Sequence, residues 1–155
     1  MTIATRKEVA MLELLPLLRR HEGLRLSAYC CPGGVWTIGW GHTAGVKAGD
    51  YVDVDTADRL LREDAAEALR QVDSLAAQSG VALTGCRRAA LASFVFNAGV
   101  GALRRSTLWK KICADPADPA IAAEFSRWIY SGGKIMPGLV VRRKEEAELY
   151  FSGQK

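Results

Sequence analysis

Three side chains capable of chemistry follow one another at close spacing near the N-terminus, within Glu22–Thr43 (EGLRLSAYCCPGGVWTIGWGHT). Glu22 carries a carboxyl group directly before a glycine, Cys31 carries a thiol nine positions later, and Thr37 carries a hydroxyl six positions further on. A carboxyl group can act as a general acid, while a second reactive group and a hydroxyl can hold and activate water. The segment therefore predicts a site that cleaves one bond of a substrate.

Glu22 is expected at the end of a helix, because helical spacing precedes it and Gly23 follows as a stop signal. The negative end of the helix dipole and partial burial both favour the protonated carboxyl group that a general acid needs. A lone glutamate at a helix end is usually solvated and has no function. The spacing to Cys31 and Thr37 therefore carries this prediction.

The spacing Glu-x8-Cys-x5-Thr resembles that of the phage-type lysozymes, the endolysins of the T4-lysozyme superfamily, in their lambdoid-phage branch. Three further stretches resemble the same family in the same order: a helix ending in Phe-Asn-x-Gly, a helix start, and a segment with a Trp, a Gly-rich turn and a Gly-Leu-x-x-Arg-Arg-x-x-Glu ending (Thr84–Gly99, Ser106–Leu108 and Phe125–Tyr150). The resemblance extends over residues 16 to 151.

The resemblance implies a muramidase that hydrolyses the β-1,4 bond between N-acetylmuramic acid and N-acetylglucosamine in bacterial peptidoglycan, for lysis of the host cell. It implies no cofactor and no metal. It also assigns residues to three roles: catalysis (Glu22, Cys31, Thr37), substrate binding (Thr43, Phe96, Asn97, Thr107) and support (His42, Asp64, Arg142). By the resemblance, His42 would pair with Asp64 on the long helix. Arg142 is the candidate partner of Glu22, and a cation there would oppose the effect of burial and favour the ionised form of Glu22, so the direction of the net effect stays open.

Cys31 is a departure from the usual pair of carboxylates, because an inverting glycosidase uses a second carboxylate to activate water or to stabilise the cationic sugar. A free thiol is mostly protonated at neutral pH. As a thiolate, Cys31 would stabilise positive charge, act as a base toward water, or attack the anomeric carbon, and the sequence does not choose among these. Two alternative functions remain: a lytic transglycosylase that forms 1,6-anhydro products, and a cell-wall-binding protein without catalysis.

Other residues of the same stretch allow two interpretations. Trp36 and Trp40, four positions apart, are expected on one strand face, where they would either stack on sugar rings or belong to the core. Gly39 and Gly41 would let the backbone approach a sugar closely. At the other end of the chain, Arg143 is expected to be a solvated charge of the last helix.

The hydrophobic spacing predicts helices separated by one β-element. Residues 5–21 read as a helix that Pro16 kinks or divides, and residues 24–46 read as short strands with turns. Asp55-Thr56 is expected to cap a long helix that reaches Ser79. The remaining expected segments are helices at 84–98, 101–104, 107–113, 119–129 and 139–151, a loop at 115–119 and a Gly-rich turn at 131–138.

These elements predict an α+β fold that is mostly helical, the bilobal fold of lysozymes, with a small β-element in the N-terminal lobe and a helical C-terminal lobe. Residues 1–155 form a single domain in this prediction. Its N-terminal lobe spans about 16–55, its linking helix 56–79 and its C-terminal lobe 80–155.

Composition narrows the possible partners and compartments. The net charge of +4 is compatible with an anionic cell wall, and no nucleic-acid-binding motif accompanies the basic residues. The cysteines match no zinc or redox spacing, and Cys86 and Cys113 are expected to be buried. The sequence offers neither a signal peptide nor a membrane-spanning stretch. We therefore expect a monomer in the host cytoplasm, without stable membrane insertion, that a holin-type pore releases to the peptidoglycan.

Overall fold

The computed structural model describes residues 5–153, apart from the side chain of Arg6. Most of the chain is helical, as predicted, and one small antiparallel sheet lies in its N-terminal third. The elements run in this order: α1 (Arg6–Glu22), β1 (Arg25–Cys30), β2 (Trp36–Gly39), α2 (Val54–Ser79), α3 (Gly85–Ala98), α4 (Val100–Arg105), α5 (Thr107–Ala114), α6 (Ile121–Phe125), β3 (Tyr130–Ser131), β4 (Lys134–Ile135) and α7 (Pro137–Phe151).

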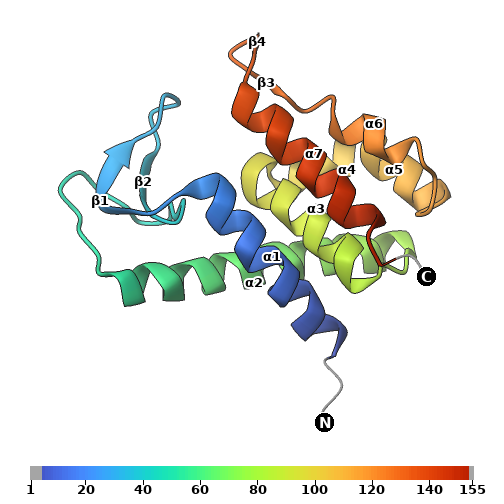
Figure 1. Ribbon diagram of the computed structural model, residues 1–155, viewed down its shortest axis with the longest axis horizontal. Coiled ribbons are helices and arrows are strands. Elements are labelled where there is room, and N and C mark those ends of the chain that lie inside the picture. Colours follow the sequence, from blue (N-terminus) through green and yellow to red (C-terminus); the bar gives the residue numbers. More distant parts are fainter. Residues whose placement is uncertain (1–4, 154–155) are drawn as a thin grey trace.

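The β-hairpin and the C-terminal helices occupy opposite ends of the molecule, and α2 runs beneath both (Figure 1). Helix α1 crosses between them and ends beside the hairpin. This arrangement fits the predicted lysozyme-like α+β fold. The predicted lobe boundaries at residues 55 and 80 stay predictions.

Helix α3 forms the centre of the core, packed against α1, α2 and α7. Eight consecutive residues of this helix, 88–95, are buried. A helix that is buried on all sides needs no polar face, which explains its run of Ala, Leu, Phe and Val side chains. The polar residues of its last turns, Ser93 and Asn97, are exceptions that lie near the site described below.

Helix α1 continues through Pro16. Of the two predicted alternatives, the division of the segment into two helices at Pro16 was therefore wrong. Proline removes one backbone hydrogen bond to the carbonyl four residues earlier, at Leu12. The Leu12 side chain is 68% exposed, which places this part of the helix toward water. Water can therefore satisfy the carbonyl group, and the helix remains intact.

The N-cap of α2 is Asp53 rather than the predicted Asp55-Thr56 pair. The Asp53 side chain accepts a hydrogen bond of 2.7 Å from the backbone N–H of Thr56. Gly80 ends the helix in the left-handed conformation, with φ of +70°. These two caps fix the 26 residues that connect the ends of the molecule.

The C-terminal third differs from the prediction in three details. The helix expected at 119–129 covers only Ile121–Phe125. The predicted Gly-rich turn contains the short hairpin β3–β4, in which Tyr130 pairs with Ile135, and α7 already begins at Pro137. Proline is suited to the first helical turn because its missing N–H has no partner there in any case.

Two predictions about side chains were also wrong. Cys113 is exposed and Cys86 is only partly buried, so neither is the buried thiol expected from its helical surroundings. Trp36 and Trp40 do not share a strand face, because β2 ends at Gly39 with φ of +64°. Trp36 is exposed, whereas Trp40 packs against the core and donates a hydrogen bond to Asp58.

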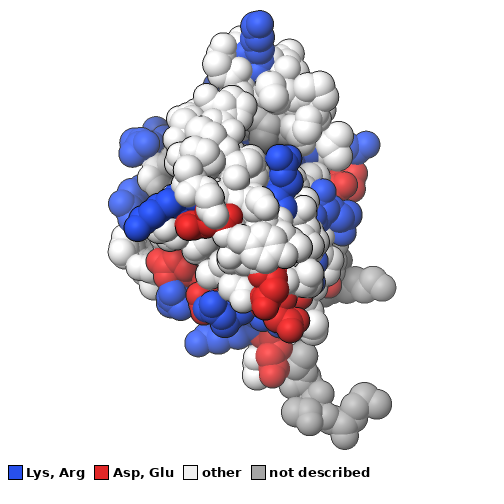
Figure 2. Space-filling model, turned by 90° about the vertical axis from the view of Figure 1, so that its left-hand side faces the viewer, with Lys and Arg blue, Asp and Glu red and all other residues white. Residues whose placement is uncertain are grey.

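On the face at the hairpin end, Lys and Arg side chains are separated by acidic and uncharged ones (Figure 2). No single basic surface covers this face. Among the described residues, no helix combines the length and the apolar character that crossing a membrane requires.

Candidate active site

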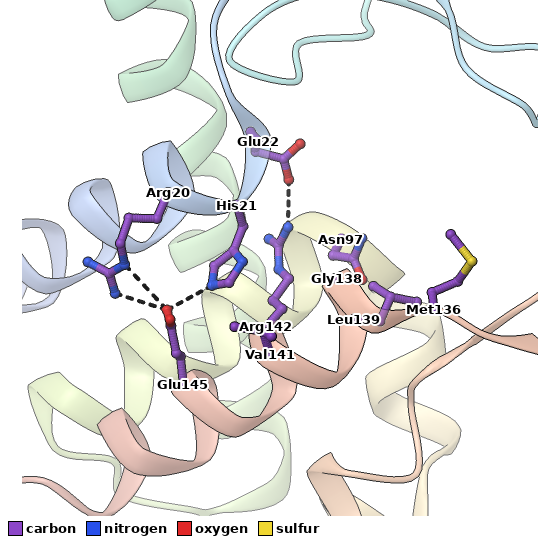
Figure 3. A pocket seen from close by; sticks show the side chains of 10 residues that line it. All are labelled: Arg20, His21, Glu22, Asn97, Met136, Gly138, Leu139, Val141, Arg142 and Glu145. Atoms are coloured by element: carbon purple, nitrogen blue, oxygen red, sulfur yellow. Dashed lines mark hydrogen bonds and ion pairs between the residues drawn. The ribbon is translucent and has the colours of Figure 1, made fainter.

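Glu22 lies at the last position of α1, and its carboxylate accepts a hydrogen bond of 2.7 Å from Arg142 on α7 (Figure 3). This is the pairing predicted from the sequence. The Glu22 side chain keeps 19% of its surface exposed, whereas that of Arg142 keeps only 4%. The cation therefore reaches Glu22 from the protein interior, and part of the carboxyl group still faces solvent.

The backbone at Gly41 closes over the other side of Glu22. A Cβ atom at Gly41 would lie 2.5 Å from Glu22 Oε2, and Gly41 has a φ of +82°, which favours glycine. The close approach seen here is to the candidate acid, and the predicted approach of Gly39 and Gly41 to a sugar stays a prediction. The turn after β2 thereby fixes the position of the Glu22 carboxylate.

Cys31 and Thr37 meet at the turn end of the β1–β2 hairpin. The Cys31 Sγ atom lies 3.1 Å from Thr37 Oγ1, and the Thr37 hydroxyl is also 3.2 Å from the carbonyl of Val35. If Cys31 is a thiol, it donates to Thr37, which donates to Val35. If Cys31 is a thiolate, the Thr37 proton turns to the sulfur atom instead. The contact thus links the charge of Cys31 to the orientation of the Thr37 hydroxyl.

Tyr29 on β1 lies within electrostatic reach of both Cys31 and Glu22. Burial raises the pKa of the Tyr29 hydroxyl, and the negative charges of Cys31 and Glu22 raise it further, against the effect of Arg25. Both anionic groups therefore lie within electrostatic reach of one side chain. The sequence analysis did not single out Tyr29, although it stands two residues before Cys31.

A hollow of about 730 Å³ opens beside Glu22, between the end of α1 and the start of α7. Asn97 lies in its wall together with Arg142, and the apolar side chains of Met136, Leu139 and Val141 complete one side (Figure 3). The hollow thus has the mixed lining that is typical of a ligand site.

The far end of the same hollow contains a second ion pair. Glu145 accepts hydrogen bonds from Arg20 at 3.1 Å and from His21 at 2.8 Å. Burial opposes the ionisation of Glu145, but these two partners hold its pKa below its usual value. The pair fastens the end of α1 to α7 within one residue of Glu22.

The predicted substrate-binding residues are distributed over three hollows. Asn97 lies with Glu22, whereas Thr43 and Phe96 line a separate hollow of about 290 Å³ beneath Gly41. Thr107 lies in a third, of about 350 Å³, at the start of α5. The structure therefore brings only Asn97 next to the candidate acid, and the binding roles of all four residues stay predictions.

His42 joins the β-element to α2, as predicted from the sequence. Its Nδ1 atom lies 2.7 Å from the Asp64 carboxylate, and its Nε2 atom lies 3.0 Å from the carbonyl of Ala44. Both partners accept hydrogen bonds, so the ring satisfies both when it carries two protons. The contact holds the segment after β2, including Gly41, at a fixed distance from the long helix.

A buried charged cluster lies directly behind Arg142. Glu146 is fully buried and contacts both Arg142 and Arg143, which keep 4% and 2% of their surface exposed. Arg143 also donates to Asn97. The sequence prediction that Arg143 is a solvated charge was therefore wrong. Arginine and glutamate three residues apart on a helix usually form a surface pair, so this burial could not be predicted from their spacing.

Within residues 5–153, no three His, Cys, Asp or Glu side chains gather in a way that could hold a metal ion. The described cysteines, including Cys30 and Cys31, form no disulfide. The arrangement around Glu22 thus consists of a carboxylate, a buried cation and a nearby thiol–hydroxyl pair.

A family model described as phage lysozyme matches residues 19–146, which is most of the chain. The chain belongs to the phage lysozyme family. This lysozyme is 40% identical over 144 residues to the endolysin of Acyrthosiphon pisum secondary endosymbiont phage 1, covering 89% of this chain and 94% of that one. It is 34% identical over 135 residues to the SAR-endolysin of Enterobacteria phage P21, covering 86% and 79%.

Solved structures agree with this assignment. The lysozyme resembles the muramidase domain of SpmX from Asticaccaulis excentricus, with a TM-score of 0.79, 28% identity and coverage of 97% of this chain and 99% of that one. It also resembles the active form of P1 phage endolysin Lyz, with a TM-score of 0.77, 26% identity and coverage of 96% and 86%. The lysozyme is therefore a lytic glycosidase of the muramidase class, and its place in the lambdoid branch stays a prediction.

Proposed function

We propose that the chain hydrolyses the β-1,4 bond between N-acetylmuramic acid and N-acetylglucosamine with Glu22 as its general acid. The observation that carries this proposal is the position of Glu22, half-enclosed by Gly41 and held by Arg142 at the edge of a hollow. Glu22 gives its proton to the glycosidic oxygen as the bond to the anomeric carbon breaks.

Cys31 and Thr37 hold the water that completes the reaction. Their contact of 3.1 Å places a sulfur atom and a hydroxyl side by side, near enough to Glu22 for both anions to act on Tyr29. Water adds to the anomeric carbon and passes a proton to a Cys31 thiolate, whose negative charge also stabilises the cationic sugar. The Cys31 thiol then gives up this proton to solvent and Glu22 takes one back, which restores both groups. The reaction needs no cofactor.

The glycan strand lies between the two ends of the molecule, across the linking helix. Asn97 contacts it beside the acid, while Thr43 and Phe96 beneath Gly41 and Thr107 at the start of α5 bind it further along. In this proposal the N-terminal lobe spans about 16–55 and the C-terminal lobe 80–155 within one domain of residues 1–155.

The lysozyme acts as a monomer on the peptidoglycan, after synthesis in the host cytoplasm. Each proposed catalytic residue comes from the same chain, so the site does not require a second copy. The free thiols of Cys30 and Cys31 fit a reducing compartment. Sedimentation of the purified protein at assay concentration should give one species of the monomer mass.

The proposal is tested by activity on purified peptidoglycan with mass spectrometry of the products. We expect Glu22→Gln to be inactive, Cys31→Ser to lose about 100-fold or more in kcat, and Cys31→Asp to retain activity with reducing-end products. Cys30→Ser is the matched control, because Cys30 is an exposed neighbouring thiol that only approaches the Cys31 carbonyl. Full activity of Cys31→Ser would contradict the assigned role of the thiol.

The absence of a carboxylate at position 31 favours one alternative, a lytic transglycosylase. Such an enzyme needs only the acid, because a hydroxyl of the sugar itself closes a 1,6-anhydro ring. Anhydro products from the unaltered chain would establish this alternative in place of hydrolysis. A cell-wall-binding protein without catalysis would instead pellet with cell walls and release no fragments.

A further inference from the structure

Glu146 is a completely buried carboxylate whose contacts lead to two walls of the proposed site. One of its oxygens, Oε2, accepts hydrogen bonds from Ser93 at 2.6 Å and from Nε of Arg142 at 3.3 Å. Its other oxygen accepts a hydrogen bond from Arg143. The carboxylate on α7 is thus joined to α3 through Ser93 and to two guanidinium groups of its own helix.

Each of these guanidinium groups extends to a different residue of the proposed site. Arg142 donates to Glu22 at 2.7 Å and to the backbone carbonyl of Ser93 at 3.0 Å. Arg143 donates to the Asn97 side chain and to the carbonyl of Trp128 at 2.9 Å. Each arginine therefore links Glu146 to a residue that would contact the substrate: Arg142 to Glu22, and Arg143 to Asn97.

We propose that Glu146 is the positioning residue of this site, which holds Arg142 against Glu22 and Arg143 against Asn97. The inference rests on the proposed function, because it assigns Glu146 a part in the reaction that Glu22 carries out. Glu146 itself has no exposed surface and does not touch the substrate. Its role follows from geometry, because a planar guanidinium group that donates to Glu146 on one side has a fixed orientation toward its partner on the other side.

Charge balance gives Glu146 a second effect on Glu22. The buried cluster holds two cations, Arg142 and Arg143, and two carboxylates, Glu146 and Glu22. Burial lowers the pKa of Arg143, and Glu146 opposes this shift. Without the Glu146 charge, the positive charges of Arg142 and Arg143 would act on the site unopposed, which would move the alkaline limb of the activity profile to lower pH.

The other groups around the two carboxylates do not supply this charge. Ser93 and Asn97 on α3 are uncharged, and Glu145 on α7 is already engaged by Arg20 and His21. On the strand side, Tyr29 and Cys31 contribute only as far as they ionise. Glu146 is therefore the carboxylate, among the described residues, that balances the second arginine of the cluster.

The test compares Glu146→Gln, which keeps the shape and removes the charge, with Glu146→Asp, which keeps the charge. Rates on soluble glycan strands are measured across pH at a temperature where circular dichroism finds each variant folded. We expect Glu146→Gln to lower kcat about tenfold with KM within about twofold of wild type. The alkaline limb of its pH–rate profile should move to lower pH by about half a unit or more, and Glu146→Asp should keep this limb at the wild-type position.

Ile112→Ala is the control for simple loss of stability, because Ile112 is a buried core residue of α5 outside the cluster. It should melt earlier and keep the wild-type pH profile. A folded Glu146→Gln with the kcat and pH limb of Ile112→Ala would overturn the inference. If Glu146→Gln does not fold, Ser93→Ala decides: a kcat lowered about threefold supports the inference, and an unchanged kcat overturns it.

The outcome for Glu22→Gln separates this inference from the proposed function. If Glu22→Gln retains activity, the assignment of the acid fails whatever the Glu146 variants do. If Glu22→Gln is inactive and the Glu146 variants behave like Ile112→Ala, the proposed function stands and only the inference about Glu146 fails.

Discussion

Gly41 is a backbone position that restrains the candidate acid from the β-hairpin side. A methyl group there would overlap Glu22, since a Cβ atom would lie 2.5 Å from Oε2 and 2.9 Å from Cδ. The Glu22 carboxylate would have to move, and its contact with Arg142 at 2.7 Å would be lost. Small displacements of a catalytic group have large effects on rate, because the acid must lie in line with the leaving oxygen.

Gly41→Ala should therefore lower kcat about tenfold or more, and destabilise the fold by about 1 kcal/mol through strain at positive φ. Gly45→Ala separates the two effects, because Gly45 has a φ of +71° but nothing within 4 Å of its added Cβ atom. We expect it to lose similar stability in urea denaturation and to keep its activity. Equal activity of the two variants would mean that Gly41 does not position Glu22.

Whether a pair of residues could be predicted did not depend on the distance between the partners along the chain. The family resemblance supplied the pair His42–Asp64, and Arg142 was the candidate partner of Glu22 although the two lie on the first and last helices. The role of Glu146 was not predicted, since its partner Ser93 lies on another helix, as does Asn97, which its other partner Arg143 contacts. Burial of a charged residue depends on the packing of whole helices, which a charge pattern on one helix does not reveal.

At the scale of elements, the start of α2 depends on one side chain. Asp53 accepts a hydrogen bond of 2.7 Å from the N–H of Thr56, whereas Asp55 lies within the first turn. Sequence alone did not separate the two, because either aspartate is a favourable N-cap residue and caps are uncertain by one or two positions. The same uncertainty explains why α7 begins at Pro137 and not at the predicted residue 139, but it does not explain why α6 ends at Phe125, well before the predicted residue 129.

Asp53→Ala should lower Tm by about 2–4 °C, and Asp55→Ala by less, as measured by circular dichroism at pH 7. Hydrogen bonds from Thr56 hold the pKa of Asp53 below its usual value. A depressed folded pKa means that the stabilisation is present above the ordinary aspartate pKa and is lost as pH falls through the folded value. The difference between wild type and Asp53→Ala should therefore vanish toward pH 2, and a constant difference would contradict the cap.

At the scale of the whole molecule, the sequence predicted which segments are helical better than how segments far apart along the chain contact one another. The sequence predicted a helix at 84–98, and the structure places α3 between α1, α2 and α7. The short β3–β4 hairpin was expected only as a turn, because two-residue strands carry no periodicity that a sequence pattern could detect. The hydrogen bond between Tyr150 and the carbonyl of Pro116 could not be predicted either, because these residues are far apart along the chain.

Tyr150 fastens the last helix to the loop after α5. Its side chain is fully buried beside Phe125 and Phe151, and its hydroxyl donates a hydrogen bond of 2.7 Å to the carbonyl of Pro116. Burial raises the pKa of Tyr150 to about 12, against the opposing charge of Arg87. Because the folded pKa lies above the unfolded one, the stabilisation is present below pH 10 and is lost as pH rises toward 12.

Tyr150→Phe should therefore change sign in its effect on stability. At pH 8 the variant should be less stable by about 1 kcal/mol, because the hydrogen bond to Pro116 is lost. Over the whole titration the wild type should lose about 2.7 kcal/mol that the variant does not lose, about 2 kcal/mol of it between pH 10 and 12, so the variant becomes the more stable protein near pH 11. Denaturation in urea at matched pH measures the difference, in which the titration of shared groups cancels. Parallel stability curves for the two proteins from pH 8 to 12 would show that the Tyr150 hydroxyl stays accessible to water and does not close the helical end of the molecule.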